Sequence, residues 1–269
     1  MPLWTLFGLE KGRATTSWPG GSLESGQRGV LGMPRFNAET CAPHCQECAS
    51  VCPTSAITVE NDAGRAQRFA VDFGRCVACQ LCVEACPTGA VSSSSDWAFG
   101  VRARSDLLFD TGGARSPGGE HAATARDGFR RSLHIRHVDS GSCNGCESEL
   151  QALNNPFYNL HRFGIFFTPS PRFADLLLVT GPVTNGMHEP LKKTYEAMPA
   201  PRWVMAFGTC AVSGGIAGGG YACSNGLEDI LPVDLYLPGS PPNPAAIIES
   251  LLMFLDRVPQ RVREGRVHD

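Results

Sequence analysis

The chain has 269 residues, of which 42% are hydrophobic and 18% charged, so it can form a packed core and is not a disordered chain. Its 23 Lys and Arg against 26 Asp and Glu give a net charge of −3, which excludes a general attraction for nucleic acid. Twelve cysteines are too many for core packing alone, and their uneven placement predicts metal sites.

The start of the chain, Met1 to Pro19, does not have the pattern of a targeting signal, because its apolar run is short and its charges follow that run. Arg130-Arg131 lies too deep in the chain for a twin-arginine signal. No segment has the roughly 18 apolar residues of a membrane span. We therefore expect a cytoplasmic protein with reduced thiols and no direct membrane span, in which clustered cysteines indicate metal more often than disulfides.

Residues 36–92 contain two similar cysteine repeats, each followed by a short β-branched run, which indicates one small unit built twice. The second repeat reads Cys-x2-Cys-x2-Cys-x3-Cys-Pro from Cys76 to Pro87. Three thiolates within seven residues can bind three corners of an iron–sulfur cube, while the fourth, before the proline, points to a second cube. Zinc is the alternative, but zinc sites usually take separated pairs of ligands.

The first repeat, from Cys41 to Pro53, is one residue longer at its first gap, and we expect the extra residue to bulge around Pro43. His44 is a possible ligand, with an ordinary loop histidine as the alternative. The crossover rule for such repeats predicts two [4Fe–4S] clusters, one on Cys41, Cys45, Cys48 and Cys86, the other on Cys76, Cys79, Cys82 and Cys52.

This half resembles the ferredoxin-like subunit of formate hydrogenlyase and the eight-iron subunit of respiratory complex I. The resemblance extends upstream through Leu9–Gly12 and Pro34–Phe36 and covers roughly residues 1–110. We assign residues 1–92 to a 2[4Fe–4S] ferredoxin-like domain. Residues 93–131 are rich in Ser and Gly and are expected to form a linker, with a long surface loop as the alternative.

From Ser132 onward, strand and helix patterns alternate, which predicts an α/β domain over residues 132–269 with a flavodoxin-like, doubly wound parallel sheet. The expected strands are 133–138, 175–180, 203–207 and 233–237. The expected helices are 147–153, 190–197 and a last one after Asn243-Pro244, with Asn243 as its cap.

Two cysteine motifs follow strands of this domain. Cys143-Asn144-Gly145-Cys146 follows the first strand, and Cys210 follows the third in a glycine-rich segment. In an open α/β sheet ligands collect beyond the carboxyl ends of strands, so we expect these thiols to converge. The nearby glycines let the backbone approach a cluster and donate N–H groups to its sulfurs. A lone Cys-x2-Cys is also compatible with zinc or a redox dithiol.

Residues 132–258 are similar to the small subunit of membrane-bound, energy-converting [NiFe] hydrogenases, a superfamily that includes the 20-kDa subunit of complex I. The matching stretches include Cys143–Glu149, Arg162–Ile165 and Pro238–Pro242. The resemblance implies a third [4Fe–4S] cluster on Cys143, Cys146 and Cys210. The family's fourth ligand is a cysteine in a Pro-Gly-Cys-Pro-Pro turn, where this chain has Ser240.

Three hypotheses remain for the fourth position: a serine oxygen or solvent, replacement by Cys223, or a three-iron or missing cluster. We expect a cluster with an unusual fourth ligand. Glu147 is placed by the resemblance beside the cluster, where a proton-path role is one interpretation and an ordinary carboxylate in the first helical turn the other. We expect Asp234 to be structural, and Arg172 to face a partner or simply the solvent.

The resemblance implies an iron–sulfur electron-transfer subunit of a hydrogenase-type or quinone-oxidoreductase-type complex, with no nickel site or other catalytic centre of its own. The implied partners are a large subunit like that of hydrogenase or the 49-kDa chain of complex I, and integral membrane subunits. The chain is then peripheral on the cytoplasmic face of the inner membrane. The alternatives are an assembly or scaffold subunit, which Ser240 favours and the eight ferredoxin cysteines oppose, and zinc binding in the C-terminal half.

Overall fold

The computed structural model describes residues 3–11, 30–60, 68–111 and 131–258. Gly12 of the upstream resemblance, residues 112–130 of the expected linker and residues 259–269 lie outside the described residues. By its contacts the chain divides into residues 1–30, which contain helix α1 (Leu3–Lys11), and residues 31–269. None of the helices in the described ranges has the length and apolar character that crossing a bilayer requires.

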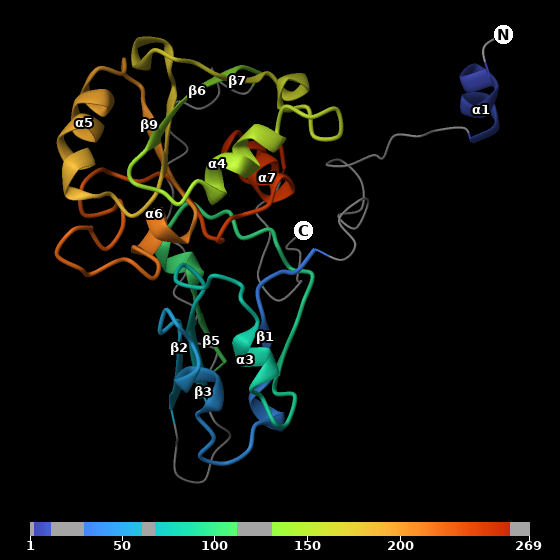
Figure 1. Cartoon of the computed structure of the whole chain (residues 1–269), viewed down its shortest axis with the longest axis vertical. Helices are drawn as coiled ribbons and strands as arrows, with labels where there is room; N and C mark the ends of the chain where they lie inside the picture. The colour runs from blue at the N-terminus through green and yellow to red at the C-terminus, as the bar shows by residue number, and fades with distance from the viewer. Residues whose placement is uncertain (1–2, 12–29, 61–67, 112–130, 259–269) are drawn as a thin grey trace. The chain divides into compact units, whose positions relative to one another are not determined.

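The first half of the larger unit is built from two small antiparallel sheets (Figure 1). Strand β1 (Arg35–Phe36) pairs with β4 (Val91–Ser92), and a second sheet has the order β2 (Ile57–Glu60), β3 (Arg68–Asp72), β5 (Leu108–Asp110). Two one-turn helices, α2 (Glu47–Ser50) and α3 (Leu81–Glu84), carry the third cysteine of each repeat. Each helix precedes a strand at the predicted β-branched run, which confirms the internal duplication.

Aromatic rings join the two sheets. Phe69 and Phe73 are fully buried, and their ring centroids lie 5.5 Å from Phe36 and 5.0 Å from Phe99, respectively. Tilted ring pairs at such distances are favourable beyond the area they bury. Strand β2 alternates buried and exposed residues because one face of its sheet packs on this core.

Much of the segment expected as a linker has defined structure. Residues 104–107 form a 3₁₀ helix, β5 extends the ferredoxin sheet, and Val101 forms an antiparallel bridge with Tyr236 of the C-terminal half. Buried Phe99, Val101 and Leu107 anchor the segment. The serines and glycines of residues 93–131 outnumber these few apolar residues, so composition alone indicated a loop.

The C-terminal half is a five-stranded, all-parallel sheet in the order β10-β9-β8-β6-β7. Its strands are β6 (Leu133–Asp139), β7 (Ile165–Phe167), β8 (Leu176–Thr180), β9 (Trp203–Phe207) and β10 (Leu235–Leu237). Every residue of β8 and β9 is buried, as expected of central strands covered on both faces. In chain order this is the flavodoxin-like arrangement 2-1-3-4-5, so the predicted doubly wound α/β fold is confirmed.

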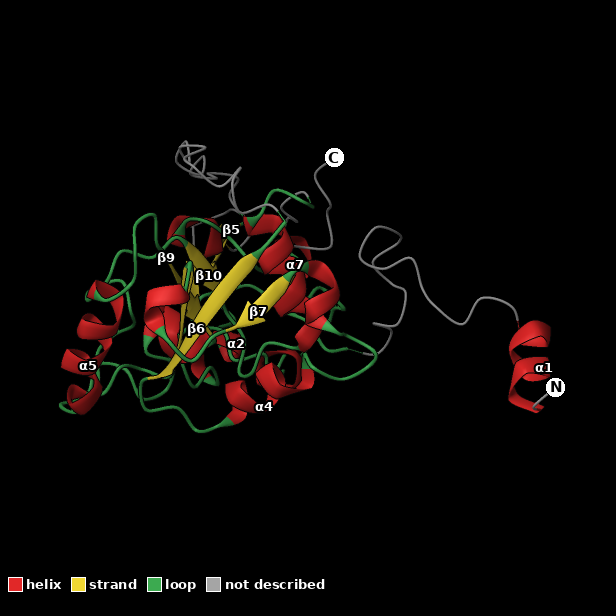
Figure 2. Cartoon of the chain, turned by 90° about the horizontal axis from the view of Figure 1, so that it is seen from above, coloured by secondary structure: helices red, strands yellow, loops and turns green. Residues whose placement is uncertain are grey.

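Helices α4 (Gly145–Ala152) and α7 (Pro244–Phe254) pack together on one side of this sheet, and α5 (Asn185–Glu196) lies on the other (Figures 1 and 2). Asn243 caps α7 as predicted, since its Oδ1 accepts from the Ala246 amide at 2.9 Å. Helix α5 begins five residues before the expected Pro190, which the helix accommodates in its interior. Strand β7 and helix α6 (Thr209–Ser213) are too short to show a period in the sequence.

Candidate iron–sulfur sites

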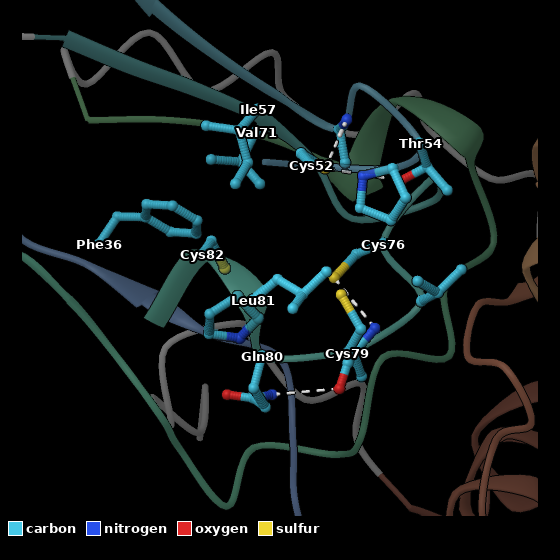
Figure 3. Close-up of a pocket in the computed structure, with 15 residues that line it drawn as sticks. Phe36, Cys52, Thr54, Ile57, Val71, Cys76, Cys79, Gln80, Leu81 and Cys82 are labelled. Atoms are coloured by element: carbon cyan, nitrogen blue, oxygen red, sulfur yellow. Dashed lines mark hydrogen bonds between the residues drawn. The ribbon is translucent and has the colours of Figure 1, made fainter. Parts of the chain in front are cut away.

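Four thiols of the ferredoxin half line one pocket. Cys76, Cys79 and Cys82 come from the second repeat, and Cys52 comes from the end of the first. Figure 3 shows Cys76, Cys79 and Cys82 in the pocket with apolar side chains above them, among them Val71. The structure thus brings together the same four cysteines that the crossover of the repeats predicts.

Burial and mutual repulsion make these thiols reluctant to ionise by themselves. Burial, with the neighbouring Cys52 and Cys79 charges adding to it, raises the pKa of Cys76 to about 11. Burial likewise raises the pKa of Cys82 to about 12, again with Cys76, Cys79 and Cys52 contributing. Four thiolates can therefore coexist here only with compensating positive charge, which the irons of a cluster supply.

The remaining four ferredoxin thiols form the corresponding group. Burial, and then the charges of Cys41, Cys82, Cys45 and Cys86, raise the pKa of Cys48 to about 12. For Cys41 the pKa is raised by burial and then by Cys45 and Cys86. Cys86 therefore lies near the cysteines of the first repeat, although it belongs to the second. In the same way Cys52, from the first repeat, lies with the cysteines of the second.

The last cysteine of each repeat accepts a hydrogen bond from the chain that follows it. The amide of Ala56 donates to Cys52 Sγ at 3.3 Å, and the amide of Val91 donates to Cys86 Sγ at 3.3 Å. Burial raises the pKa of Cys86, but the hydrogen bonds from Val91 and around Thr88 outweigh it, so the pKa of this thiol is lowered. Such N–H donors stabilise a thiolate and tune the potential of a cluster bound to it.

The ligand loops depend on left-handed turns at residues other than glycine. Ala78 and Gln80 have φ of 55° and 65°, which wraps Cys76, Cys79 and Cys82 around the pocket. In the first repeat a turn from Ala42 to Cys45, with a hydrogen bond of 3.2 Å, accommodates the extra residue and leaves His44 exposed. The expected bulge around Pro43 is confirmed. A positive φ at a residue other than glycine costs free energy, so it persists only where the surrounding structure requires it.

The donor chemistry of both groups fits [4Fe–4S] clusters: each offers soft sulfur atoms, with backbone N–H groups directed at several of them. Within the described ranges no three His, Cys, Asp or Glu side chains converge closely enough to hold a single metal ion.

A third group of thiols lies at the carboxyl ends of the C-terminal strands. Cys143 and Cys146 follow β6 at the start of α4, and Cys210 follows β9 in the first turn of α6. Burial raises the pKa of Cys146 to about 12, with Glu147, Cys210 and Cys143 contributing. Burial and Cys143 also raise the pKa of Cys210. The three thiols predicted to converge lie at the same edge of the sheet, near enough for their charges to interact.

Glycines allow the backbone to approach these thiols. A Cβ at Gly208, whose φ is +84°, would lie 2.7 Å from Cys146 Sγ. A Cβ at Gly215, whose φ is +58°, would lie 3.1 Å from Cys210 Sγ. Only glycine fits at position 208, because a Cβ would clash with Cys146 Sγ and because the backbone there has a positive φ.

The two candidates for a fourth ligand lie near different thiols of this group. Ser240 is exposed in a turn that passes near Cys143. A Cβ added at Gly145 would lie 3.5 Å from Cys143 Sγ and 3.9 Å from Cδ of Pro241, the residue after Ser240. Cys223 is half-buried, forms a bridge with Thr184, and contributes to the raised pKa of Cys210. Each is therefore a neighbour of the thiol group.

The Glu147 carboxylate lies between Ser142, just before its own helix, and Thr180 at the end of β8. Its carboxylate accepts a hydrogen bond from Ser142 Oγ at 2.7 Å and a second, short one from Thr180 Oγ1. His137 Nε2 lies 3.5 Å from Glu147 Oε1 and 3.0 Å from Thr180 Oγ1. The sequence reasoning missed His137 and Thr180, because strand residues 43 apart become neighbours only through the parallel pairing of β6 and β8.

The two remaining candidates have simple environments. Asp234 has the structural role expected of it, because its Oδ2 accepts from the Val204 amide at 2.9 Å and its own amide donates to the Val204 carbonyl. Arg172 lies exposed in a 3₁₀ turn beside Phe173, whose side chain is 73% exposed.

Comparison with known families gives two matches that divide the chain as its cysteine groups do. The family described as "NADH ubiquinone oxidoreductase, 20 Kd subunit" matches residues 143–254, and the "4Fe-4S dicluster domain" matches residues 39–90. The second match supports [4Fe–4S] clusters as the cofactor of the ferredoxin half.

Individual proteins match over about half of this chain. Formate hydrogenlyase subunit 7 of Escherichia coli (strain K12) is 42% identical over 134 residues, 50% of this chain and 52% of that protein. The probable membrane-bound hydrogenase subunit mbhJ of Pyrococcus furiosus is 42% identical over 133 residues, 49% of this chain and 80% of that protein. The chain thus spans about half the length of the formate hydrogenlyase subunit.

Among solved structures, a chain of the membrane-bound sulfane sulfur reductase, described as an archaeal respiratory membrane complex, is 34% identical. The match has a TM-score of 0.43 and covers 52% of this chain and 81% of that one.

Proposed function

Because the chain belongs to the NADH ubiquinone oxidoreductase 20 Kd subunit family and carries a 4Fe-4S dicluster domain N-terminal to the region that matches this family, we propose that the chain is an iron–sulfur electron-transfer subunit. It works in a membrane-associated complex of the hydrogenase or complex I type. The observation that carries the proposal is the sorting of eight ferredoxin thiols into two crossed sets of four, beside a third set at the edge of the parallel sheet.

We assign one [4Fe–4S] cluster to Cys41, Cys45, Cys48 and Cys86, and another to Cys76, Cys79, Cys82 and Cys52. A third is assigned to Cys143, Cys146 and Cys210, with Ser240 at the fourth position and Cys223 as the alternative. When bound, such clusters take up and release one electron at a time. The chain contributes the thiolates, the N–H donors and the burial that set the potentials.

The partners follow from the relatives, whose names describe subunits of formate hydrogenlyase and of a membrane-bound hydrogenase. We propose that this chain binds a large subunit like that of hydrogenase or the 49-kDa chain of complex I, together with integral membrane subunits. Its place is then peripheral, on the cytoplasmic face of the inner membrane. The end of the sheet that holds Cys143, Cys210 and Ser240 faces the large subunit, because a terminal cluster must lie near its electron partner.

The first test is an iron inventory. Anaerobically purified protein is expected to contain about eight irons and matching acid-labile sulfide from the two ferredoxin clusters, and about four more from the third. Zinc in place of iron, with no brown colour, contradicts the proposal. Affinity purification from the native host is expected to retrieve a large subunit and membrane proteins.

The second test concerns the fourth position of the third site. Ser240→Cys supplies a thiolate beside Cys143, so it is expected to make the third cluster more resistant to loss and to shift its potential, while both ferredoxin signals stay unchanged. Cys223→Ser is the companion variant and is expected to have little effect. The measurement is electron paramagnetic resonance during a redox titration.

The alternative function is an assembly or scaffold subunit with a degenerate third site, and the serine at position 240 is the feature that favours it. Absence of a third signal in the wild type, in Ser240→Cys and in Cys223→Ser supports that alternative. A third signal abolished by Cys223→Ser and indifferent to Ser240→Cys identifies Cys223 as the fourth ligand.

A further inference from the structure

One buried hydroxyl connects the ferredoxin half to the third site. Thr209 is 1% exposed, and its Oγ1 donates to the carbonyl oxygen of Cys76 at 2.9 Å, across 133 residues of sequence. The same Oγ1 accepts from the Gly239 amide at 3.0 Å. The Thr209 amide in turn donates to the Gly239 carbonyl at 2.8 Å.

This arrangement joins three segments that carry candidate ligands. Cys76 is itself a ligand of the second ferredoxin set, Thr209 directly precedes Cys210, and Gly239 directly precedes Ser240. A hydroxyl has one proton to donate and lone pairs that accept, so Thr209 can satisfy both of its partners at once. A valine of the same shape can satisfy neither.

Other contacts between the two halves lie away from the thiols. Val101 and Tyr236 exchange backbone hydrogen bonds of 2.9 and 2.8 Å, and Arg102 donates to the Met253 carbonyl at 2.7 Å. These contacts hold the halves together but do not involve a ligand loop. The hydroxyl of Thr209 acts directly on the loops that carry the cofactors.

We propose that Thr209 is a positioning residue that fixes the spacing between the cluster held by Cys52, Cys76, Cys79 and Cys82 and the third site. The inference rests on the proposed function, since it requires clusters at both places. It also makes the second-repeat cluster the neighbour of the third site. In a transfer between the two, one cluster is oxidised and the other reduced by one electron, with no bond broken and no proton moved.

The test compares Thr209→Val with Thr209→Ser in the full chain, purified anaerobically and reduced with dithionite. The first readout is the magnetic coupling between neighbouring reduced clusters, seen as broadening of their paramagnetic resonance signals, which depends on their separation. The second is hydrogen exchange of the Gly239 amide, which loses its acceptor in the valine variant. Thr209→Val is expected to keep all three signals, but to lose the broadening and to accelerate exchange of the Gly239 amide. Thr209→Ser is expected to keep the broadening and the exchange rate of the wild type.

Ser213→Ala is the matched control, because it removes another largely buried hydroxyl of the same short helix, one that donates to the Thr209 carbonyl and does not reach the ferredoxin half. It is expected to leave the coupling unchanged. If Thr209→Val loses iron, the smaller Thr209→Ala is compared with Thr209→Ser in its place.

The outcomes separate this inference from the proposed function. A wild type with only two ferredoxin signals overturns the third cluster, and the inference with it. Three signals whose broadening is the same in wild type and in the valine variant, while the Gly239 amide exchanges faster in the variant, overturn the inference alone. Equal loss of broadening in Ser213→Ala also overturns it.

Discussion

Gly208 and His137 are two single residues near the thiols proposed for the third cluster, and they contribute to their surroundings in different ways. Gly208 separates β9 from α6, and its backbone passes close to Cys146 Sγ. His137 lies half-buried at the end of β6 against Glu147 and Thr180. Gly208 matters for the space and the backbone conformation beside Cys146, whereas His137 matters for its charge. A variant at Gly208 is therefore expected to affect the fit of a cluster, and a variant at His137 the pH dependence of stability.

Gly208→Ala is expected to remove the third cluster and spare the two ferredoxin clusters. The new methyl group would lie 2.7 Å from Cys146 Sγ, and the backbone of Gly208, with φ of +84° and ψ of 156°, lies in a region essentially restricted to glycine that costs another residue about 1–3 kcal/mol even without a clash. Iron content is expected to fall by about four per chain. Gly186→Ala is the control: its Cβ meets nothing within 4 Å and it lies within α5, so the change is expected to be neutral or stabilising.

The charge state of His137 predicts a pH dependence. Burial lowers the pKa of this imidazole from 6.5, although Glu147 and Asp139 oppose the shift and Arg136 reinforces it. The unfolded chain therefore binds a proton more readily than the folded one, so stability is complete above about pH 6.5 and is lost as the pH falls toward the folded pKa. His137→Gln does not titrate and is expected to flatten this loss. Anaerobic urea unfolding between pH 5.5 and 8 checks it, and equal slopes for both proteins contradict it.

Within the ferredoxin sheet, strand β3 is held at its two ends by different ion pairs. At one end Arg104 donates to Asp72 at 2.6 Å, with both side chains about one-fifth exposed. At the other end Arg68 forms a forked pair with Asp110 and is 44% exposed. The Asp72 end leads directly to the second-repeat ligands, since the charge of Asp72 contributes to the raised pKa of Cys76.

Arg104→Leu is expected to destabilise the ferredoxin half by about 1–3 kcal/mol, because it leaves a partly buried carboxylate without its partner. It is also expected to make the potential of the adjacent cluster more negative, because a cation that favours the reduced cluster is lost. Redox titration and urea unfolding measure the two effects. Arg68→Leu, at the exposed end of the same strand, is expected to change neither appreciably. Equal effects from both variants contradict this account.

The whole larger unit is expected to unfold cooperatively, because its two halves share backbone hydrogen bonds as well as the Thr209 contact. The antiparallel bridge between Val101 and Tyr236 is made by a segment that also covers α7, where Gly100 lies directly against Ser250. This explains why every residue of α7 is buried, although the sequence predicted a single apolar face.

Val101→Pro removes the N–H that donates to Tyr236 and is expected to uncouple the two halves. In the wild type, loss of cluster absorbance and exposure of the β8 and β9 amides to hydrogen exchange are expected to share one urea midpoint. In the variant the two midpoints are expected to separate. Val101→Ala keeps both backbone bonds and serves as the control. Coincident midpoints in the proline variant show that the halves are coupled by other contacts.

The sequence by itself predicted thiolate ligands for iron–sulfur clusters and determined the class of fold. Cysteines spaced two or three residues apart must lie in one short loop, so their spacing reports the local chemistry without knowledge of the fold. Long apolar runs such as Trp203–Phe207 likewise identify buried strands, and strand–helix alternation implies a doubly wound sheet.

Only the tertiary structure decided which distant residues meet. The contact of Thr209 with Cys76, the hydrogen bond from Thr180 to Glu147 and the addition of β5 to the ferredoxin sheet join segments between 33 and 133 residues apart. The side chains involved are ordinary polar residues, with no spacing or composition that marks them. Their roles arise from strand order and packing. These depend on how the whole chain buries its apolar surface, and no local sequence pattern encodes them.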